Sequence, residues 1–116
     1  MAEQNCIFCK IAAGEIPAQL VYEDEAAVAF RDINPQAPAH VLVIPREHVA
    51  SLAEAGEAQE SLLGRLLLAA ARVAREAGLV ESGYRTVINT GAGAGQSVFH
   101  LHLHVLGGRP LSWPPG

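Results

Sequence analysis

Apolar residues recur with a period of two in several stretches of the chain, and this period predicts β-strands. One of these stretches, His40–Ile44, is apolar on both faces, as in a central strand that is covered on each side. The five predicted strands are Gln19–Glu23, Ala26–Arg31, His40–Ile44, Tyr84–Thr90 and Ser97–Leu106. Polar residues separate the first two and a Gly-rich loop joins the last two, so the sheet is expected to be mainly antiparallel.

Elsewhere the apolar period lengthens to that of a helix. From about Gln59 to Ala77, leucine, alanine and valine residues recur at helical spacing, and Gly78 is a typical stop. A short helix is predicted over residues 5–13, ended by Gly14. These elements predict one α+β domain over residues 1–116, with a five-stranded, mainly antiparallel sheet, one long helix and one short helix.

Charge and hydropathy narrow the range of partners. Half of the 116 residues are apolar, which is enough for one core, and the net charge is −4. This charge argues against generic binding to nucleic acid or to anionic membranes, but not against a small phosphate ligand. The most apolar helical stretch, residues 62–74, is too short to span a bilayer, and residues 1–5 lack the pattern of a secretion signal. We therefore expect a cytoplasmic protein.

Three histidines alternate with leucines in the last predicted strand, at positions 100, 102 and 104. Side chains of a strand alternate between its faces, so all three imidazoles are expected on one face. Such a row suits two kinds of chemistry: metal binding, or covalent catalysis in which one imidazole attacks phosphorus and its neighbours bind phosphoryl oxygens. A third interpretation, polar groups satisfied on a half-exposed strand, fits a lone histidine better than three in strict alternation.

The loop before this strand, residues 91–97, is rich in glycine and ends in Ser97. Glycine lets backbone N–H groups approach an anion closely, and a serine hydroxyl can donate to a phosphate oxygen. Asn89, at the end of the preceding strand, can reach the same place. The loop and the histidine row together predict a phosphate-binding site.

Cys6-x-x-Cys9 near the N-terminus has three interpretations. A redox pair of the thioredoxin type would follow a strand, and none precedes it here. Two ordinary buried cysteines on a short helix are the second interpretation. Half of a zinc site is the third, and it requires two more ligands from elsewhere in the chain.

Three segments resemble the histidine triad (HIT) family of nucleotide hydrolases and transferases. Residues 95–106, Gly-Gln-Ser-Val-Phe-His-Leu-His-Leu-His-Val-Leu, look like the family signature, and residues 32–45 continue the match. Gly107-Gly108-Arg109 and Trp113-Pro114-Pro115-Gly116 are similar to the branch called histidine triad nucleotide-binding proteins (Hint). The resemblance covers essentially the whole chain and implies a HIT-like fold.

The resemblance also implies an activity, that of a purine nucleoside phosphoramidase. Such an enzyme hydrolyses an adenosine 5′-monophosphoramidate to AMP and an amine without a catalytic cofactor. By motif position, His102 is the expected nucleophile that forms a nucleotidyl-histidine. His104 and Ser97 are expected to hold the phosphoryl oxygens and to help pass a proton to the leaving group, with His40 beside them.

The same resemblance implies where the nucleotide binds. Asp32 and the backbone of Ile33 are expected to take the ribose hydroxyls, since a carboxylate can accept from both. The expected nucleotide-binding set is Asp32, Ile33, Asn89, Gly95, Gln96, Ser97, His102 and His104.

Two further features follow from the family. Some bacterial HIT proteins with a similar Cys-x-x-Cys carry a structural zinc, and His48 and His100 are the candidate remaining ligands beside Cys6 and Cys9, because the family pattern needs neither for catalysis. In Hint-like proteins the tail around Trp113 reaches the partner subunit near its active site, which implies a homodimer.

Three alternatives stay open at this point. A dinucleoside polyphosphate hydrolase of the same superfamily would use the same nucleophile. A nucleotide-binding regulatory protein would hydrolyse its ligand only incidentally. A metal-dependent enzyme would use the three histidines as ligands.

Overall fold

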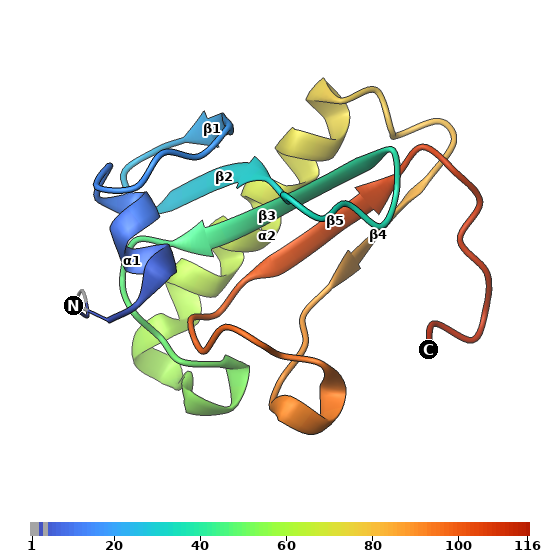
Figure 1. The fold of residues 1–116 in the computed structure, drawn as a ribbon. Coiled ribbons are helices and arrows are strands. Elements are labelled where there is room, and N and C mark those ends of the chain that lie inside the picture. Colours follow the sequence, from blue (N-terminus) through green and yellow to red (C-terminus); the bar gives the residue numbers. More distant parts are fainter. Residues whose placement is uncertain (1–2, 4) are drawn as a thin grey trace.

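The computed structural model describes residue 3 and residues 5–116, and at its centre is one five-stranded antiparallel sheet (Figure 1). The strands stand in the order β1-β2-β3-β5-β4, so β3 lies in the middle as predicted. Their bounds are β1 Leu20–Glu23, β2 Ala27–Arg31, β3 Ala39–Pro45, β4 Tyr84–Val87 and β5 Leu103–Gly107. The helices are α1 Ile7–Ala12 and α2 Glu60–Glu76, with 3₁₀ turns η1 Leu52–Glu54, η2 Glu57–Gln59 and η3 Ala92–Ala94. The predicted α+β architecture is confirmed.

Helices cover both faces of the sheet, and two apolar clusters result (Figure 1). The larger cluster packs the apolar stripe of α2, centred on Leu66 and Val73, against the side chains of Val43 and Val105. The smaller cluster lies on the other face, where Phe8 of α1 packs against β2 and β3. Strand β3 is buried along almost its whole length, because α2 covers one face of the sheet there and α1 covers the other.

The histidine strand is shorter than predicted. The sequence pattern predicts a strand over 97–106, but β5 begins only at Leu103, where it pairs with Val43 of β3. The ladder stops there because β3 ends at Pro45, which has no N–H, and because the N–H of Leu101 donates to the carbonyl of Val49 at 2.7 Å instead. Strand β4 is likewise shorter than the predicted 84–90.

The alternation of the three histidines nevertheless holds. The rings of His100 and His102 both meet the edge of Phe8, with centroids 5.9 and 5.2 Å away, and the ring of His102 lies 5.0 Å from that of His104. All three therefore lie on the side of the sheet that faces α1.

No helix within the described residues has both the length and the apolar character needed to cross a lipid bilayer.

Candidate active site and metal cluster

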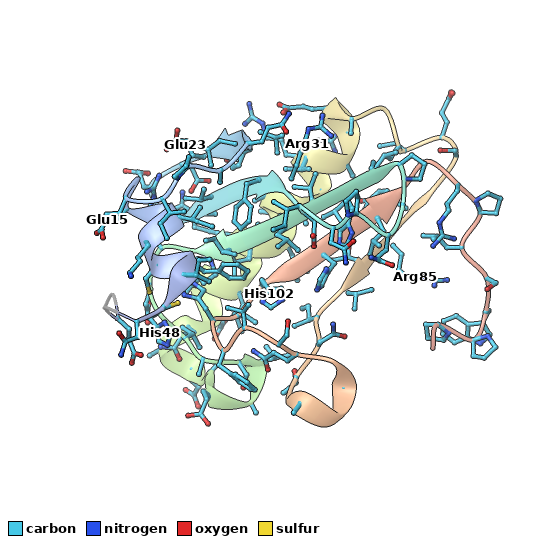
Figure 2. The ribbon with its side chains drawn as sticks, in the orientation of Figure 1. Glu15, Glu23, Arg31, His48, Arg85 and His102 are labelled. Atoms are coloured by element: carbon cyan, nitrogen blue, oxygen red, sulfur yellow. The ribbon has the colours of Figure 1, made fainter. Side chains whose placement is uncertain are left out.

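A cavity of about 530 Å³ lies between α1 and the sheet, a size typical of small-molecule sites. Most of its wall is apolar and comes from α1, the segment after it, and strands β2 and β3. The apolar lining includes Ile7, Phe8, Ile11, Ile16, Phe30 and Leu42. Ser97, His102 and His104 line it as well, and so do Asp32 and the exposed Ile33. Figure 2 shows His102 between α1 and β5, at the centre of this face.

His102 is buried, and one hydrogen bond sets its tautomer. Its Nδ1 lies 2.8 Å from the carbonyl oxygen of His100, which can only accept. In the neutral ring the hydrogen is therefore on Nδ1, and Nε2 keeps its lone pair. Because His102 lines the cavity, this lone pair is what the ring offers to a ligand.

His104 has the opposite arrangement, and a chain of two hydrogen bonds produces it. The backbone N–H of Gln36 donates to Nδ1 of His40 at 3.0 Å, so the hydrogen of neutral His40 is on Nε2. That Nε2 lies 2.9 Å from Nδ1 of His104 and donates to it. The hydrogen of neutral His104 is thus on Nε2, and His104 offers a donor where His102 offers an acceptor.

Burial keeps His40 and His104 uncharged near neutral pH. It lowers the pKa of His104 to about 4, assisted by repulsion from His102 and His40 and opposed by the nearby Asp32 carboxylate. Burial also lowers the pKa of His40, again opposed by Asp32, whose Oδ2 lies 3.4 Å from Nε2 of His40. The tautomers described above therefore belong to the neutral rings present at pH 7.

Gln96 lies in the glycine-rich loop, and its almost fully buried side chain hydrogen-bonds across the loop. Its Oε1 accepts from the N–H of Gly91 at 2.8 Å, and its Nε2 donates to the carbonyls of Ala50 and Val98. Gly91 and Gly95 adopt positive φ angles, which glycine accommodates without strain, at the two ends of η3. Gln96 thus holds the loop against the body of the protein and directs the chain into Ser97.

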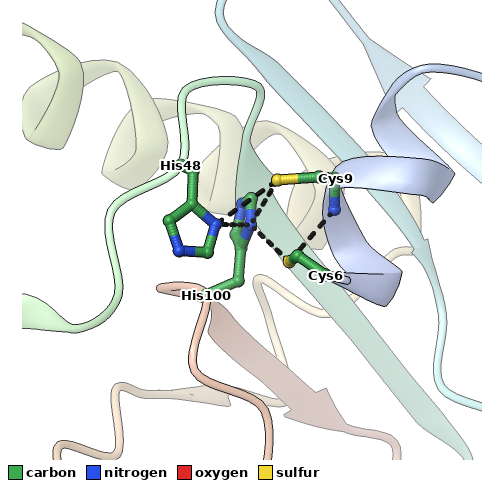
Figure 3. Close-up of side chains that lie close together, drawn as sticks. All are labelled: Cys6, Cys9, His48 and His100. Atoms are coloured by element: carbon green, nitrogen blue, oxygen red, sulfur yellow. Dashed lines mark hydrogen bonds between the residues drawn. The ribbon is translucent and has the colours of Figure 1, made fainter. Parts of the chain in front are cut away.

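The four residues proposed from the sequence as metal ligands come together in one cluster (Figure 3). Cys6 and Cys9 lie at the start of α1, His48 in the segment after β3, and His100 just before β5. The sulfur of Cys6 lies 3.2 Å from Nδ1 of His100, that of Cys9 lies 3.3 Å from Nδ1 of His48, and the two Nδ1 atoms are 3.2 Å apart. Segments far apart in sequence thus meet at four ligand atoms.

These separations come within about 0.4 Å of the edges of a zinc tetrahedron. Zn–S bonds of about 2.3 Å and Zn–N bonds of about 2.05 Å place sulfur and nitrogen about 3.6 Å apart and two nitrogens about 3.3 Å apart. The second nitrogen of the His100 ring is bonded as is usual for a metal-binding histidine. Its Nε2 donates to the carbonyl of Pro45 at 2.8 Å, which leaves Nδ1 as the lone-pair nitrogen. Burial lowers the pKa of His100 to about 4 and raises the pKa of Cys9, so neither group gains a charge at pH 7 without a cation. The donor set fits a structural divalent zinc.

The structure divides the predicted site residues into three groups. His40, His102, His104, Ser97, Asp32 and Ile33 gather at the larger cavity or directly behind it. Asn89 instead lines a second cavity of about 270 Å³ on the far side of His104. Gly95 and Gln96 line neither, and their expected contact with the nucleotide stays a prediction. Neither metal-ligating cluster of the described residues unites the three triad histidines, so they do not form one ligand set.

Sequence reasoning missed the part that α1 plays in the site. Ile7, Phe8 and Ile11 form one wall of the larger cavity, and Phe8 also packs edge-on against His102. Their spacing at i, i+1 and i+4 in a short helix indicates one apolar face, which is the signal that could have located this wall.

Comparison with known proteins agrees with this fold and this histidine pattern. The HIT domain profile matches residues 13–111. A HIT family hydrolase from Legionella pneumophila has a structure with a TM-score of 0.95 and 53% identity, covering 97% of this chain and 100% of that one. A 14 kDa zinc-binding protein from Zea mays is 54% identical over 95% of this chain and 87% of its own length. A histidine triad nucleotide-binding protein from Candida albicans has a TM-score of 0.81 at 32% identity, covering 95% and 83% of the two chains.

An open antiparallel sheet with a histidine pair at one end of an apolar cavity thus defines a histidine triad protein. The chain belongs to the HIT family.

The lowered pKa values predict acid sensitivity. His104 has a pKa of about 4 when folded and about 6.5 when unfolded, so between these values the unfolded chain binds more protons. The free energy of unfolding should therefore fall as the pH drops from 7 to 4, with no contribution from His104 above about pH 7. Urea denaturation of the wild type and of His104→Asn at pH 7, 5.5 and 4.5 measures this, and the wild type should lose more stability. Equal losses in the two proteins would contradict the assignment.

Proposed function

We propose that this protein hydrolyses purine nucleoside 5′-phosphoramidates to AMP and an amine through a nucleotidyl-histidine intermediate. The observation that carries the proposal is the pair of opposite tautomers at the end of the larger cavity. His102 offers a lone pair and His104 offers an N–H donor, with ring centroids 5.0 Å apart. Displacement at phosphorus needs both, a nucleophile and a group that stabilises the oxygens or assists the leaving atom.

The larger cavity provides a binding site for the nucleoside. A purine base is flat and mostly apolar, which suits a wall built from α1, Phe30 and Leu42. Asp32 and Ile33 line the same cavity, and we assign the ribose hydroxyls to the Asp32 carboxylate and the Ile33 backbone. The relative from Candida albicans, a histidine triad nucleotide-binding protein by title, supports a nucleotide as the ligand.

The reaction proceeds in two displacements. In the first, Nε2 of His102 attacks the α-phosphorus, a P–N bond to His102 forms, and the P–N bond to the amine breaks. In the second, water attacks phosphorus, the bond to His102 breaks, and AMP leaves. The amine takes up one proton as it departs and the attacking water releases one, so the cycle consumes no net proton. His104 and Ser97 carry this proton to the amine. His40, hydrogen-bonded behind His104, keeps its ring oriented.

The nucleophile is tested by substitution and by trapping. His102→Ala should lower kcat on adenosine 5′-monophosphoramidate by on the order of 10³-fold or more, because the first displacement has no other nucleophile. Arg75→Gln, an exposed change at the end of α2, is the matched control and should retain wild-type turnover.

Mass spectrometry of wild-type protein quenched during turnover should locate the nucleotidyl adduct on His102. An adduct on His100 or His104 would overturn the assignment. Faster cleavage of a dinucleoside polyphosphate than of the phosphoramidate would favour the other hydrolase activity of the superfamily.

We further propose that Cys6, Cys9, His48 and His100 hold a structural zinc ion. The tetrahedral spacing of their ligand atoms supports this, as does the name of the zinc-binding relative from Zea mays. The ion would join α1, the segment after β3 and the chain just before β5, and no catalytic step uses it.

The zinc proposal predicts a metal-dependent stability. Purified protein should contain one zinc per chain by elemental analysis, and exhaustive chelation should lower its melting temperature. A ligand present at a thousand times its Kd stabilises by about 4 kcal/mol, so the shift should be several degrees or more. Cys9→Ser should bind less zinc and respond less to the chelator. A metal-free wild type with an unchanged melting temperature would refute the site.

We also propose a homodimer. The outer face of α2 carries Leu67 and Leu68, which are 53% and 73% exposed, and β4 is an edge strand of the sheet, so a second copy would cover both. Light scattering should give twice the chain mass for the wild type and a lower mass for Leu68→Glu, because a buried charge weakens an apolar interface. A monomeric wild type at micromolar concentration would contradict this proposal.

A further inference from the structure

The second cavity opens on the far side of His104 from the apolar one. It has a volume of about 270 Å³ and is bounded by β4, β5 and the C-terminal segment. His104 lines both cavities and therefore stands between them. The second cavity differs in charge, because it is lined by Arg85 and Arg109 and by no acidic residue.

The register of the sheet places Arg85 on the same face as the histidines. Val87 of β4 lies opposite His104, and Arg85 lies opposite Leu106, so Arg85 is one diagonal step from His104 on the same face. In Figure 2, Arg85 lies beside the C-terminal segment, where its Nη2 donates to the carbonyls of Leu111 and Ser112. These two bonds use Nη2 and leave Nε and Nη1 available to a ligand.

Arg109 comes to the cavity from the other end of β5. Its Nε and Nη2 donate to the carbonyl of Gln36 at 3.2 and 3.0 Å, which holds the guanidinium group close to the cavity. Carbonyl partners orient an arginine but do not neutralise it.

Neither arginine has a carboxylate within 4.0 Å in the part of the chain that the structure describes. Arg46, Arg65 and Arg72 do have such partners there. Two uncompensated guanidinium groups therefore border one small cavity in a protein whose net charge is −4. The remaining N–H groups of a guanidinium donate charge-assisted hydrogen bonds to carboxylate and phosphate oxygens, so this cavity has the chemistry of an anion site.

We propose that the second cavity is the subsite for the leaving group, and that it selects leaving groups that carry an anion. This inference rests on the proposed function. With the nucleoside in the larger cavity and phosphorus at His102 and His104, the rest of the substrate extends past His104 into the second cavity. The anion is a carboxylate when the leaving group is an amino acid bound to phosphorus through its amine. It is a phosphate when the leaving group is a nucleotide.

A matched pair of substrates tests the selection. The adenosine 5′-phosphoramidates of β-alanine and of β-alaninamide have the same length and differ by one negative charge. Wild-type kcat/KM should favour the acid by about tenfold, as expected for one charge-assisted hydrogen bond. Raising the salt concentration should reduce that ratio, because dissolved ions screen the charges of the two guanidinium groups. In Arg85→Gln the ratio should fall to about one to two, whereas the control Arg75→Gln should keep the wild-type ratio.

Other outcomes identify the anion or overturn the inference. If the two phosphoramidates react alike but Arg85→Gln slows a dinucleoside tetraphosphate relative to the control, the anion is phosphate and the subsite stands. If the wild-type ratio is near one and the tetraphosphate is unaffected, or if Arg85→Gln slows acid and amide equally, the inference is wrong. Arg109→Gln and the salt series decide the matter should Arg85→Gln fail to fold.

The unsubstituted phosphoramidate separates this result from the proposed function. It carries no anion beyond phosphorus, so its turnover by the wild type depends on His102 and not on the second cavity. Turnover of that substrate, with no preference for the β-alanine over the β-alaninamide phosphoramidate, would refute the subsite but not the proposed function. If the wild type does not turn over that substrate, both the proposed function and the subsite are refuted.

Discussion

The site depends on the hydrogen bond from Nδ1 of His102 to the carbonyl of His100. A carbonyl cannot donate, so this one contact decides which nitrogen of His102 carries hydrogen and which presents a lone pair. The position of the carbonyl depends in turn on His100, whose ring is fully buried and bonded to Pro45 at the end of the central strand. The arrangement at the cavity is therefore supported by the buried central strand of the sheet.

This arrangement requires that β5 begin only at Leu103. Had the strand begun at residue 97, the backbone of residues 97–102 would have paired with a neighbouring strand. Instead the N–H of Leu101 bonds to Val49, and His100 turns toward Cys6 and Cys9. Because the chain departs from regular pairing here, His100 joins the metal cluster while His102, two residues later, lines the larger cavity.

Local pattern predicted most of the fold because strands and helices leave periodic signals. The apolar run of β3 identified a central strand, and the stripe on α2 identified its buried face. The late start of β5 left no such signal, because it comes from contacts with residues about fifty and ninety positions away in sequence. Histidine spacing located the row, but the opposite tautomers of His102 and His104 depend on Gln36 and a backbone carbonyl, which no pattern encodes. The second cavity was missed for the same reason, since Arg85 and Arg109 meet only after β4 and β5 pair.

Residue Gln36 takes part in two of these systems through its backbone. Its N–H donates to His40, and its carbonyl accepts from Arg109. The two groups belong to adjacent peptide units, whose dipoles are polarised by what they bind. A ligand that draws the Arg109 guanidinium away from Gln36 would therefore change the polarisation of the peptide unit next to the one that donates to His40. The loop between β2 and β3 thus contacts the histidine pair through the N–H of Gln36 and the second cavity through its carbonyl.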